Sequence, residues 1–122
     1  MEERQLAEQI AQILYDKKAH DIITLDVSRL TVICDWMVIA TGRTSTQVKA
    51  LADEVDEKMA EAGIALRRIE GVNEGRWIVM DYGTILVHIF HTEERAYYNL
   101  ERLWSEGDNR LEMSFDKYKD ED

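Results

Sequence analysis

Two histidines and one cysteine are the side chains of this sequence best suited to metal binding or nucleophilic chemistry. His88 and His91 are candidate zinc ligands, with Cys34 or Asp35 as further ligands. Residues three apart on a strand point to opposite faces, so the two histidines converge only if the strand ends between them. Cys34 paired with His20 or His88 matches no motif for a thiol nucleophile, and its neighbours favour a buried thiol. The sequence therefore predicts neither a metal site nor a catalytic cysteine.

A second candidate for chemistry is the turn formed by residues 41–45 (TGRTS), between an apolar strand and an amphipathic helix. This unit is similar to the phosphate-facing turn of nucleotidyltransferases, and a helix N-terminus attracts anions. Nucleotidyl transfer needs carboxylates at D-x-D spacing to hold magnesium ions, but Asp81 has no acidic residue two positions on. The turn also lacks the Gly-Lys-Ser/Thr ending of a P-loop. We predict that the protein is not an enzyme, with a nucleotide-binding or nucleotidyltransferase-like enzyme as the alternative.

A third candidate is a surface on the strand predicted over residues 77–82. If Ile78 and Met80 face the core, the period of two places Trp77, Val79 and Asp81 on the other face. An exposed tryptophan beside a carboxylate is typical of a docking site for a basic protein. The alternative is that a second layer of helices covers this face, which would make Trp77 a core residue.

The net charge bounds the class of partner. The chain has 122 residues, with 25 Asp and Glu against 15 Lys and Arg, giving a formal net charge of −10. This length predicts one domain, and this charge argues against binding nucleic acid by neutralising phosphates. The acidic, amphipathic start is unlike a signal peptide, and the longest apolar runs are too short to cross a bilayer. We expect a cytoplasmic protein that binds neither a membrane nor a specific nucleic-acid sequence.

The periodicity of apolar residues predicts a single α/β domain, with a mixed sheet of about five strands flanked by helices. The strand at 36–40 is apolar on both faces, as expected inside a sheet, and the strand at 21–27 has one face at least partly exposed to water. The strand at 66–70 is weak and peripheral, and the next two strands form an antiparallel hairpin around Gly83. The predicted helices cover 2–18, 44–62 and 92–104, and the predicted strands cover 21–27, 36–40, 66–70, 77–82 and 84–90.

The ends of the helices carry further signals. Thr44 and Gln47 have the spacing of a capping box, and Gly63 suits the end of the same helix. Thr92 is the predicted N-cap of the last helix. The apolar face of this last helix consists of Tyr97, Leu100, Leu103 and Trp104.

The composition changes after Ser105. Residues 106–122 hold seven acidic and three basic side chains, which predicts a flexible acidic tail with short-lived order around 111–118. We therefore divide the chain into a domain over residues 1–105 and a tail over residues 106–122.

From Asp21 to Trp104 the sequence resembles the ribosomal silencing factor family, also called RsfS or Iojap. Several separate segments match in the same order. They are 21–26, 35–45 with Gln47 and Val48, 70–71, 77–81 with Gly83, 87–90, 94–95 and 98–104.

The resemblance implies a factor without catalytic activity or cofactor, whose fold is similar to that of nucleotidyltransferases without their catalytic carboxylates. It implies binding to the large ribosomal subunit through ribosomal protein uL-fourteen, on the face that meets the small subunit. A bound factor would block subunit joining and repress translation when nutrients are scarce or during subunit maturation. The resemblance leaves open whether the protein is a monomer or a homodimer. The resemblance assigns partner binding to Trp77, Asp81, Tyr82, Glu70, His88 and Arg95.

Overall fold

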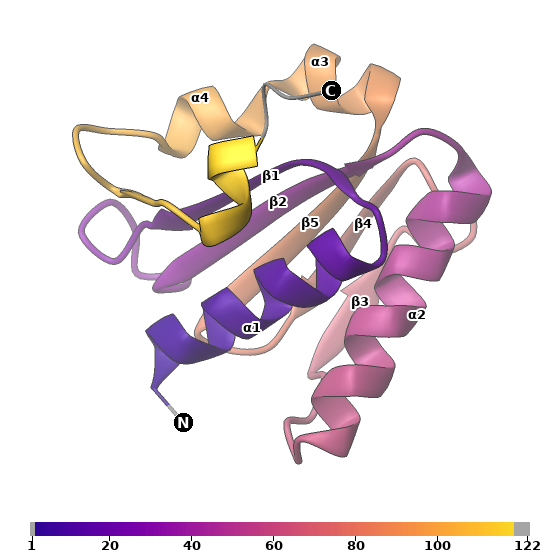
Figure 1. Ribbon diagram of the computed structural model, residues 1–122, viewed down its shortest axis with the longest axis horizontal. Coiled ribbons are helices and arrows are strands. Elements are labelled where there is room, and N and C mark those ends of the chain that lie inside the picture. The colour runs from indigo at the N-terminus through magenta and orange to yellow at the C-terminus, as the bar shows by residue number, and fades with distance from the viewer. Residues whose placement is uncertain (1, 119–122) are drawn as a thin grey trace.

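Two parallel strands form the centre of the fold in this computed structural model, which describes residues 2–118. β2 (Trp36–Gly42) and β5 (Ile85–His91) pair in register along their whole length, from Trp36 opposite Ile85 to Gly42 opposite His91 (Figure 1). Nearly all of their side chains are buried, because the sheet carries helices on both faces. The predicted interior strand is confirmed, as is the single α/β domain.

Within residues 2–118 the sheet has six strands in the order β3-β4-β5-β2-β1-β6, one more than the approximate five predicted, and the additional strand is β6 (Arg110–Leu111). The hairpin of β4 (Trp77–Asp81) and β5 is antiparallel, as predicted, and β3 (Arg68–Glu70) is the exposed edge strand beside it. β1 (His20–Asp26) pairs antiparallel with β2. The sheet is mixed because β2 and β5, which are joined through α2 (Ser45–Glu61), β3 and β4, run parallel, while the other pairs are antiparallel.

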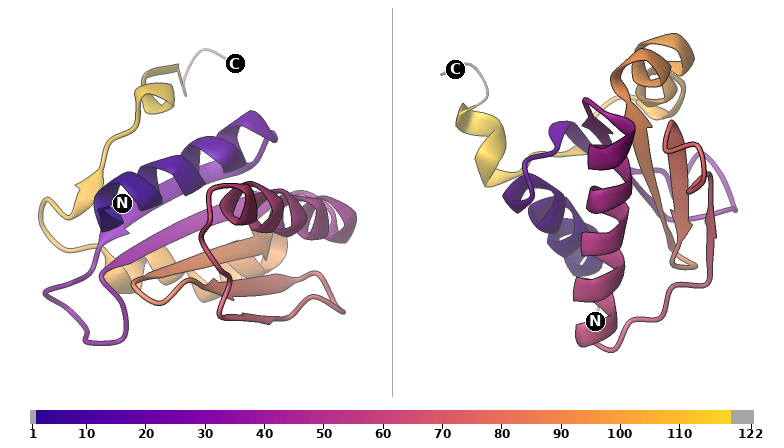
Figure 2. Two further views of the ribbon diagram at one scale, coloured as in Figure 1. Left: turned by 90° about the horizontal axis from the view of Figure 1, so that it is seen from below. Right: turned by 90° about the vertical axis from the view of Figure 1, so that its right-hand side faces the viewer.

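Two long helices cover one face of the sheet. α1 (Glu3–Asp16) and α2 (Ser45–Glu61) lie side by side over it (Figure 2). Thr24 of β1 is only 1% exposed beneath this layer, so the expected wet face of β1 is limited to its ends, where Asp21 is exposed. The larger of the two apolar cores lies here, and among its fully buried residues are Ile10, Leu14, Leu51, Met59, Ile78, Met80, Ile85 and Ile89. No helix of residues 2–118 has the length and apolar content that crossing a bilayer requires.

Both ends of α2 are held as the sequence predicts. The Thr44 hydroxyl accepts a hydrogen bond from the Gln47 backbone N–H at 3.0 Å, and Gly63 follows the helix with φ of 81°. The return bond of the capping box differs from the prediction. The Gln47 carboxamide oxygen accepts from the N–H of Arg43 at 2.7 Å, one residue before the N-cap.

Replacing the N-cap of α2 should destabilise the domain by a small, measurable amount. We expect Thr44→Ala to lower the free energy of unfolding by about 1 kcal/mol, because the first turn of α2 loses its side-chain acceptor. The matched control is Thr46→Ala in the same turn, whose exposed side chain should change stability by less than about 0.5 kcal/mol. Urea unfolding of both variants measures the difference, and equal midpoints would contradict the capping role.

The last predicted helix is two helices. α3 (Thr92–Tyr98) and α4 (Leu100–Trp104) are separated by Asn99, which has left-handed backbone angles of φ 46° and ψ 49°. The predicted N-cap was wrong by one residue, because the ring Nδ1 of His91 accepts from the Glu93 N–H at 3.3 Å. The predicted apolar face was also wrong at Tyr97 and Leu103, which are 83% and 71% exposed. An asparagine tolerates this conformation better than most residues, and the break turns α4 so that other side chains face the sheet.

The segment after Ser105 packs on the domain. Arg110–Leu111 forms β6, which pairs with β1, and Ser114–Tyr118 forms a short 3₁₀ helix, η1. The ring of Phe115 stacks on Tyr15 of α1 at a centroid distance of 4.4 Å. Apolar side chains of this acidic segment, such as Phe115, therefore pack against α1. Residues 119–122 of the predicted tail lie outside the described residues.

Candidate functional site

The sheet face opposite α1 and α2 is covered by short helices over part of its area and is open to solvent over the rest. The covered side is the smaller core, where Leu100 and Trp104 of α4 pack on Met37, Ile39 and Phe90. The open side spans β3, β4 and the start of β5. Residues directly opposite each other in a sheet point to the same face, which places six accessible side chains together here. We call this surface the Trp77 face, and it consists of Arg68, Glu70, Trp77, Val79, Asp81 and Leu86.

Trp77 lies where the covered and open sides meet. Its ring stacks on Phe90 at 4.9 Å and contacts the ring of Tyr98 at 4.7 Å with an interplanar angle of 43°. Its indole N–H donates to Nδ1 of His88 at 3.1 Å. The Trp77 side chain is half-buried, so it is neither the fully exposed docking residue nor the fully buried core residue that the sequence left as alternatives. The short helices α3 and α4 cover one side of Trp77 and leave the other side accessible.

His88 lies opposite Val79 and points to the same face of the sheet as Trp77, but it is covered and only 6% exposed. Because Nδ1 accepts the hydrogen bond from Trp77, the ring proton of the neutral form lies on Nε2. Among residues 2–118, Nε2 has no hydrogen-bond partner. Burial lowers the pKa of His88 to about 4, so the ring is neutral at pH 7. His88 is therefore a neutral, buried residue that supports Trp77 by accepting the hydrogen bond from its indole N–H.

The two predicted acidic residues both lie on the Trp77 face, at its edge. One carboxylate oxygen of Asp81 accepts from the N–H of Gly83 at 2.7 Å, which holds the β4–β5 turn. Glu70 is exposed on β3 and forms an ion pair with Arg68 at 2.8 Å. The face therefore combines an aromatic and aliphatic centre with a charged rim, an arrangement common in protein interfaces.

Two predicted interface residues lie away from this surface. Tyr82 is 6% exposed within the core under α1 and α2, where burial raises the pKa of its phenol. Its hydroxyl has no hydrogen-bond partner among residues 2–118. Arg95 is 7% exposed and lies between α3 and the sheet. Only Glu70, Trp77 and Asp81 of the predicted set are brought together at the surface.

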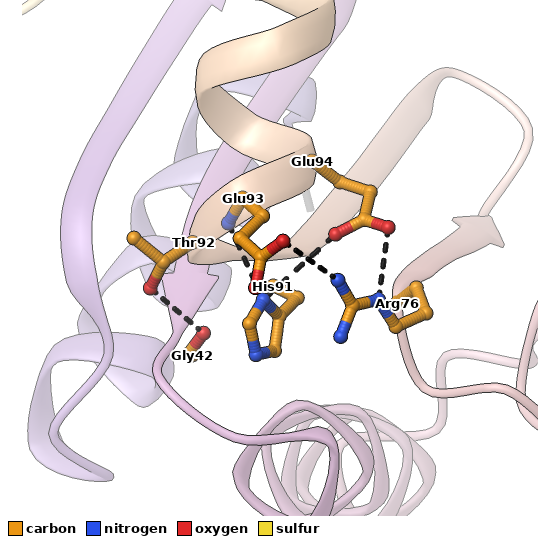
Figure 3. Close-up of polar contacts among 6 residues, drawn as sticks. All are labelled: Gly42, Arg76, His91, Thr92, Glu93 and Glu94. Atoms are coloured by element: carbon orange, nitrogen blue, oxygen red, sulfur yellow. Dashed lines mark hydrogen bonds and ion pairs between the residues drawn. The ribbon is translucent and has the colours of Figure 1, made fainter.

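The start of α3 is fastened to the strand that carries Trp77 (Figure 3). The guanidinium of Arg76 is 2.8 Å from a carboxylate oxygen of Glu94 and 3.6 Å from one of Glu93. This pairing lowers the pKa of Glu94. The Thr92 hydroxyl is 3.5 Å from the carbonyl oxygen of Gly42, at the end of β2. These contacts fix where α3 begins relative to Trp77.

The side chains weighed as metal ligands or as a thiol nucleophile are placed as follows within residues 2–118. No three His, Cys, Asp or Glu side chains in this part of the chain are placed to hold one metal ion. Cys34 is 4% exposed, and burial raises its pKa to about 11, so it is a protonated thiol at neutral pH. The predicted buried thiol is confirmed.

Sequence reasoning missed Tyr98, the residue that covers one side of Trp77. The periodicity pointed to Tyr97 as the inward residue, because it assumed an unbroken helix through Asn99. The signal was Asn99 itself, one of the few residues that commonly ends a helix in the left-handed conformation.

The chain matches a described protein family over its whole length and individual proteins over most of it. The family described as "Ribosomal silencing factor during starvation" matches residues 1–122. "Ribosomal silencing factor RsfS" of Bacillus subtilis is 42% identical over 91 residues, which cover 75% of this chain and 77% of that protein. "Protein Iojap-related, mitochondrial" of Arabidopsis thaliana is 33% identical over 102 residues, 80% of this chain and 55% of that protein. A crystal structure of a Chromobacterium violaceum protein has a TM-score of 0.83 and 36% identity, covering 93% of this chain and 97% of that one.

Proposed function

Because this chain belongs to the ribosomal silencing factor (RsfS) family, we propose that it binds the large ribosomal subunit and keeps the small subunit from joining. The proposed contact is ribosomal protein uL-fourteen, and the proposed place of action is the cytoplasm. The consequence would be repression of translation, and starvation is the condition that the family description names. No bond is made or broken in this mechanism, because occupying a shared surface is enough.

The observation that best supports this proposal is the accessible side of Trp77. Tryptophan is the side chain that most often anchors a protein interface, and anchors are effective at the centre of a patch that excludes water. Here Val79 is the next residue of β4 on the same face, Leu86 lies opposite Asp81 at the far end of the strand, and Asp81 and Glu70 contribute negative charge. We infer that uL-fourteen is the partner that covers this surface.

The charge of the chain is consistent with a protein contact on an RNA-rich particle. A net charge of −10 repels phosphates and attracts basic protein surfaces, which raises the rate of encounter with the latter. The carboxylates of Asp81 and Glu70 would direct the partner's basic side chains toward the rim. Trp77 would then be the main apolar anchor of the contact.

A sucrose-gradient experiment tests the proposal with the pure protein. We expect it to sediment with isolated large subunits, and to reduce the yield of complete ribosomes when small subunits are added afterwards. Failure to sediment with large subunits would contradict the proposed partner. Sedimentation without any effect on joining would instead identify a maturation factor that leaves before the subunits meet.

A further inference from the structure

Arg95 is a buried charged side chain that joins three elements of the fold. Its Nε–H lies 3.1 and 3.0 Å from the two carboxylate oxygens of Glu101, and its Nη1–H donates to the hydroxyl of Thr41 at 2.7 Å. Thr41 belongs to β2 and is 3% exposed, and Glu101 belongs to α4. One guanidinium on α3 therefore ties α3 to both α4 and the sheet.

The bridge from Arg95 to Glu101 crosses the point where the helix breaks. Asn99 is the left-handed residue between α3 and α4, and its own N–H donates to the Arg95 carbonyl at 3.0 Å. α3 has seven residues and α4 has five, which is too short for either helix to be stable without tertiary contacts. The position of α4 relative to α3 therefore depends on contacts such as the Arg95–Glu101 pair.

Tyr98 lies in the chain between the two residues that this bridge joins. It is the last residue of α3, between Arg95 and Glu101 in the chain, and its ring is 4.7 Å from Trp77. Tyr98 is 49% exposed, so it is not held there by burial in the core. The bond from Arg95 to Thr41 holds the end of α3 that carries this ring, and a shift of that end would change the area of Trp77 that a partner can reach.

We propose that Arg95 is a positioning residue, which holds Tyr98 beside Trp77 and so sets the shape of the Trp77 face. The resemblance placed Arg95 among the residues that touch the partner, whereas its burial assigns it a role beneath the surface. The effect on partner binding rests on the proposed function. The effect on α3 and α4 follows from the contacts of this chain alone.

Two variants test the bridge. Arg95→Gln removes the guanidinium and with it both the pair with Glu101 and the bond to Thr41, whereas Thr41→Val removes only the acceptor on β2 and leaves the pair with Glu101 intact. In both we expect backbone amides of residues 98–104 to exchange hydrogen at least tenfold faster, while exchange in β2 and β5 stays unchanged. We also expect about tenfold weaker binding to large subunits. Thr41→Val provides the decisive result if Arg95→Gln does not fold.

Arg102→Gln is the matched control, because Arg102 is an exposed arginine on the neighbouring helix α4 and lies within the segment whose exchange is measured. It should change neither amide exchange nor binding. Faster exchange at unchanged affinity would overturn the positioning role, and so would exchange that Arg95→Gln and Arg102→Gln alter equally. If the unaltered protein fails to bind large subunits, the proposed function is wrong, and the exchange data still test whether Arg95 holds α4.

Discussion

We expect Trp77→Ala to weaken binding to isolated large ribosomal subunits by about 100-fold, which corresponds to about 3 kcal/mol. Trp77 has the largest side chain of the Trp77 face, and alanine would leave a hollow beside Phe90 and Tyr98. Quantitative co-sedimentation at constant salt measures the loss. A reduction below about threefold would show that the partner does not use this residue as an anchor.

Trp77→Phe separates the loss of the ring from damage to the fold. Phenylalanine cannot donate to His88, but it keeps an aromatic ring on Phe90. We therefore expect most of the binding to remain.

A second variant tests the charged rim: Asp81→Asn removes the charge and keeps an oxygen that accepts from the Gly83 N–H. Asp53→Asn makes the same charge change on the exposed side of α2, on the opposite face of the sheet. Only the Asp81 variant should weaken binding.

The parts of the fold that were predictable are those in which local pattern and tertiary environment agree. α2 carries its cap, its apolar stripe and its terminal glycine within one stretch of sequence. β2 is apolar on both faces, which suits a strand covered on both sides. The β4–β5 hairpin has two strands joined by a short turn, so its pairing follows from its length.

The parts that were not predictable depend on contacts between distant segments. Thr24 looks like a residue for a wet face, but α1 lies across that part of β1. Phe115 belongs to a segment whose composition suggests a tail, and its position depends on Tyr15, 100 residues earlier. Neither contact leaves a signal in the local sequence, because each follows from how separate elements pack.

The sequence correctly placed Trp77 and Asp81 at the surface of the candidate site, but it did not distinguish the exposed residues around them from the buried ones. Trp77 and Asp81 follow from the period of two in β4, which needs only the assumption that Ile78 faces the core. His88 and Arg95 match a family pattern, and a pattern of residue types does not distinguish a side chain that touches a partner from one that supports such a side chain. Burial separates the two cases, and it places both residues beneath the surface.

The burial of His88 has a consequence for stability that can be measured without any ribosome. The pKa of His88 is about 4 in the folded protein and about 6.5 for an exposed histidine. Between these values the unfolded chain binds more protons than the folded one, so acid favours unfolding. The stabilisation is fully present above about pH 6.5 and is lost as the pH falls toward 4. A difference of 2.5 pKa units corresponds to about 3 kcal/mol.

We therefore expect His88→Gln to reduce the acid sensitivity of the fold. Glutamine has a carboxamide oxygen that can accept from the Trp77 indole N–H, but it does not titrate. Urea unfolding at pH 7 and pH 4 should show a loss of stability in the unaltered protein about 3 kcal/mol larger than in His88→Gln, because the titrating carboxylates are common to both. Trp77→Phe breaks the same hydrogen bond but retains the histidine, so its acid sensitivity should follow that of the unaltered protein. If stability instead changes with pH equally in His88→Gln and the unaltered protein, His88 is not held neutral by burial, and the support that it gives Trp77 must be reconsidered.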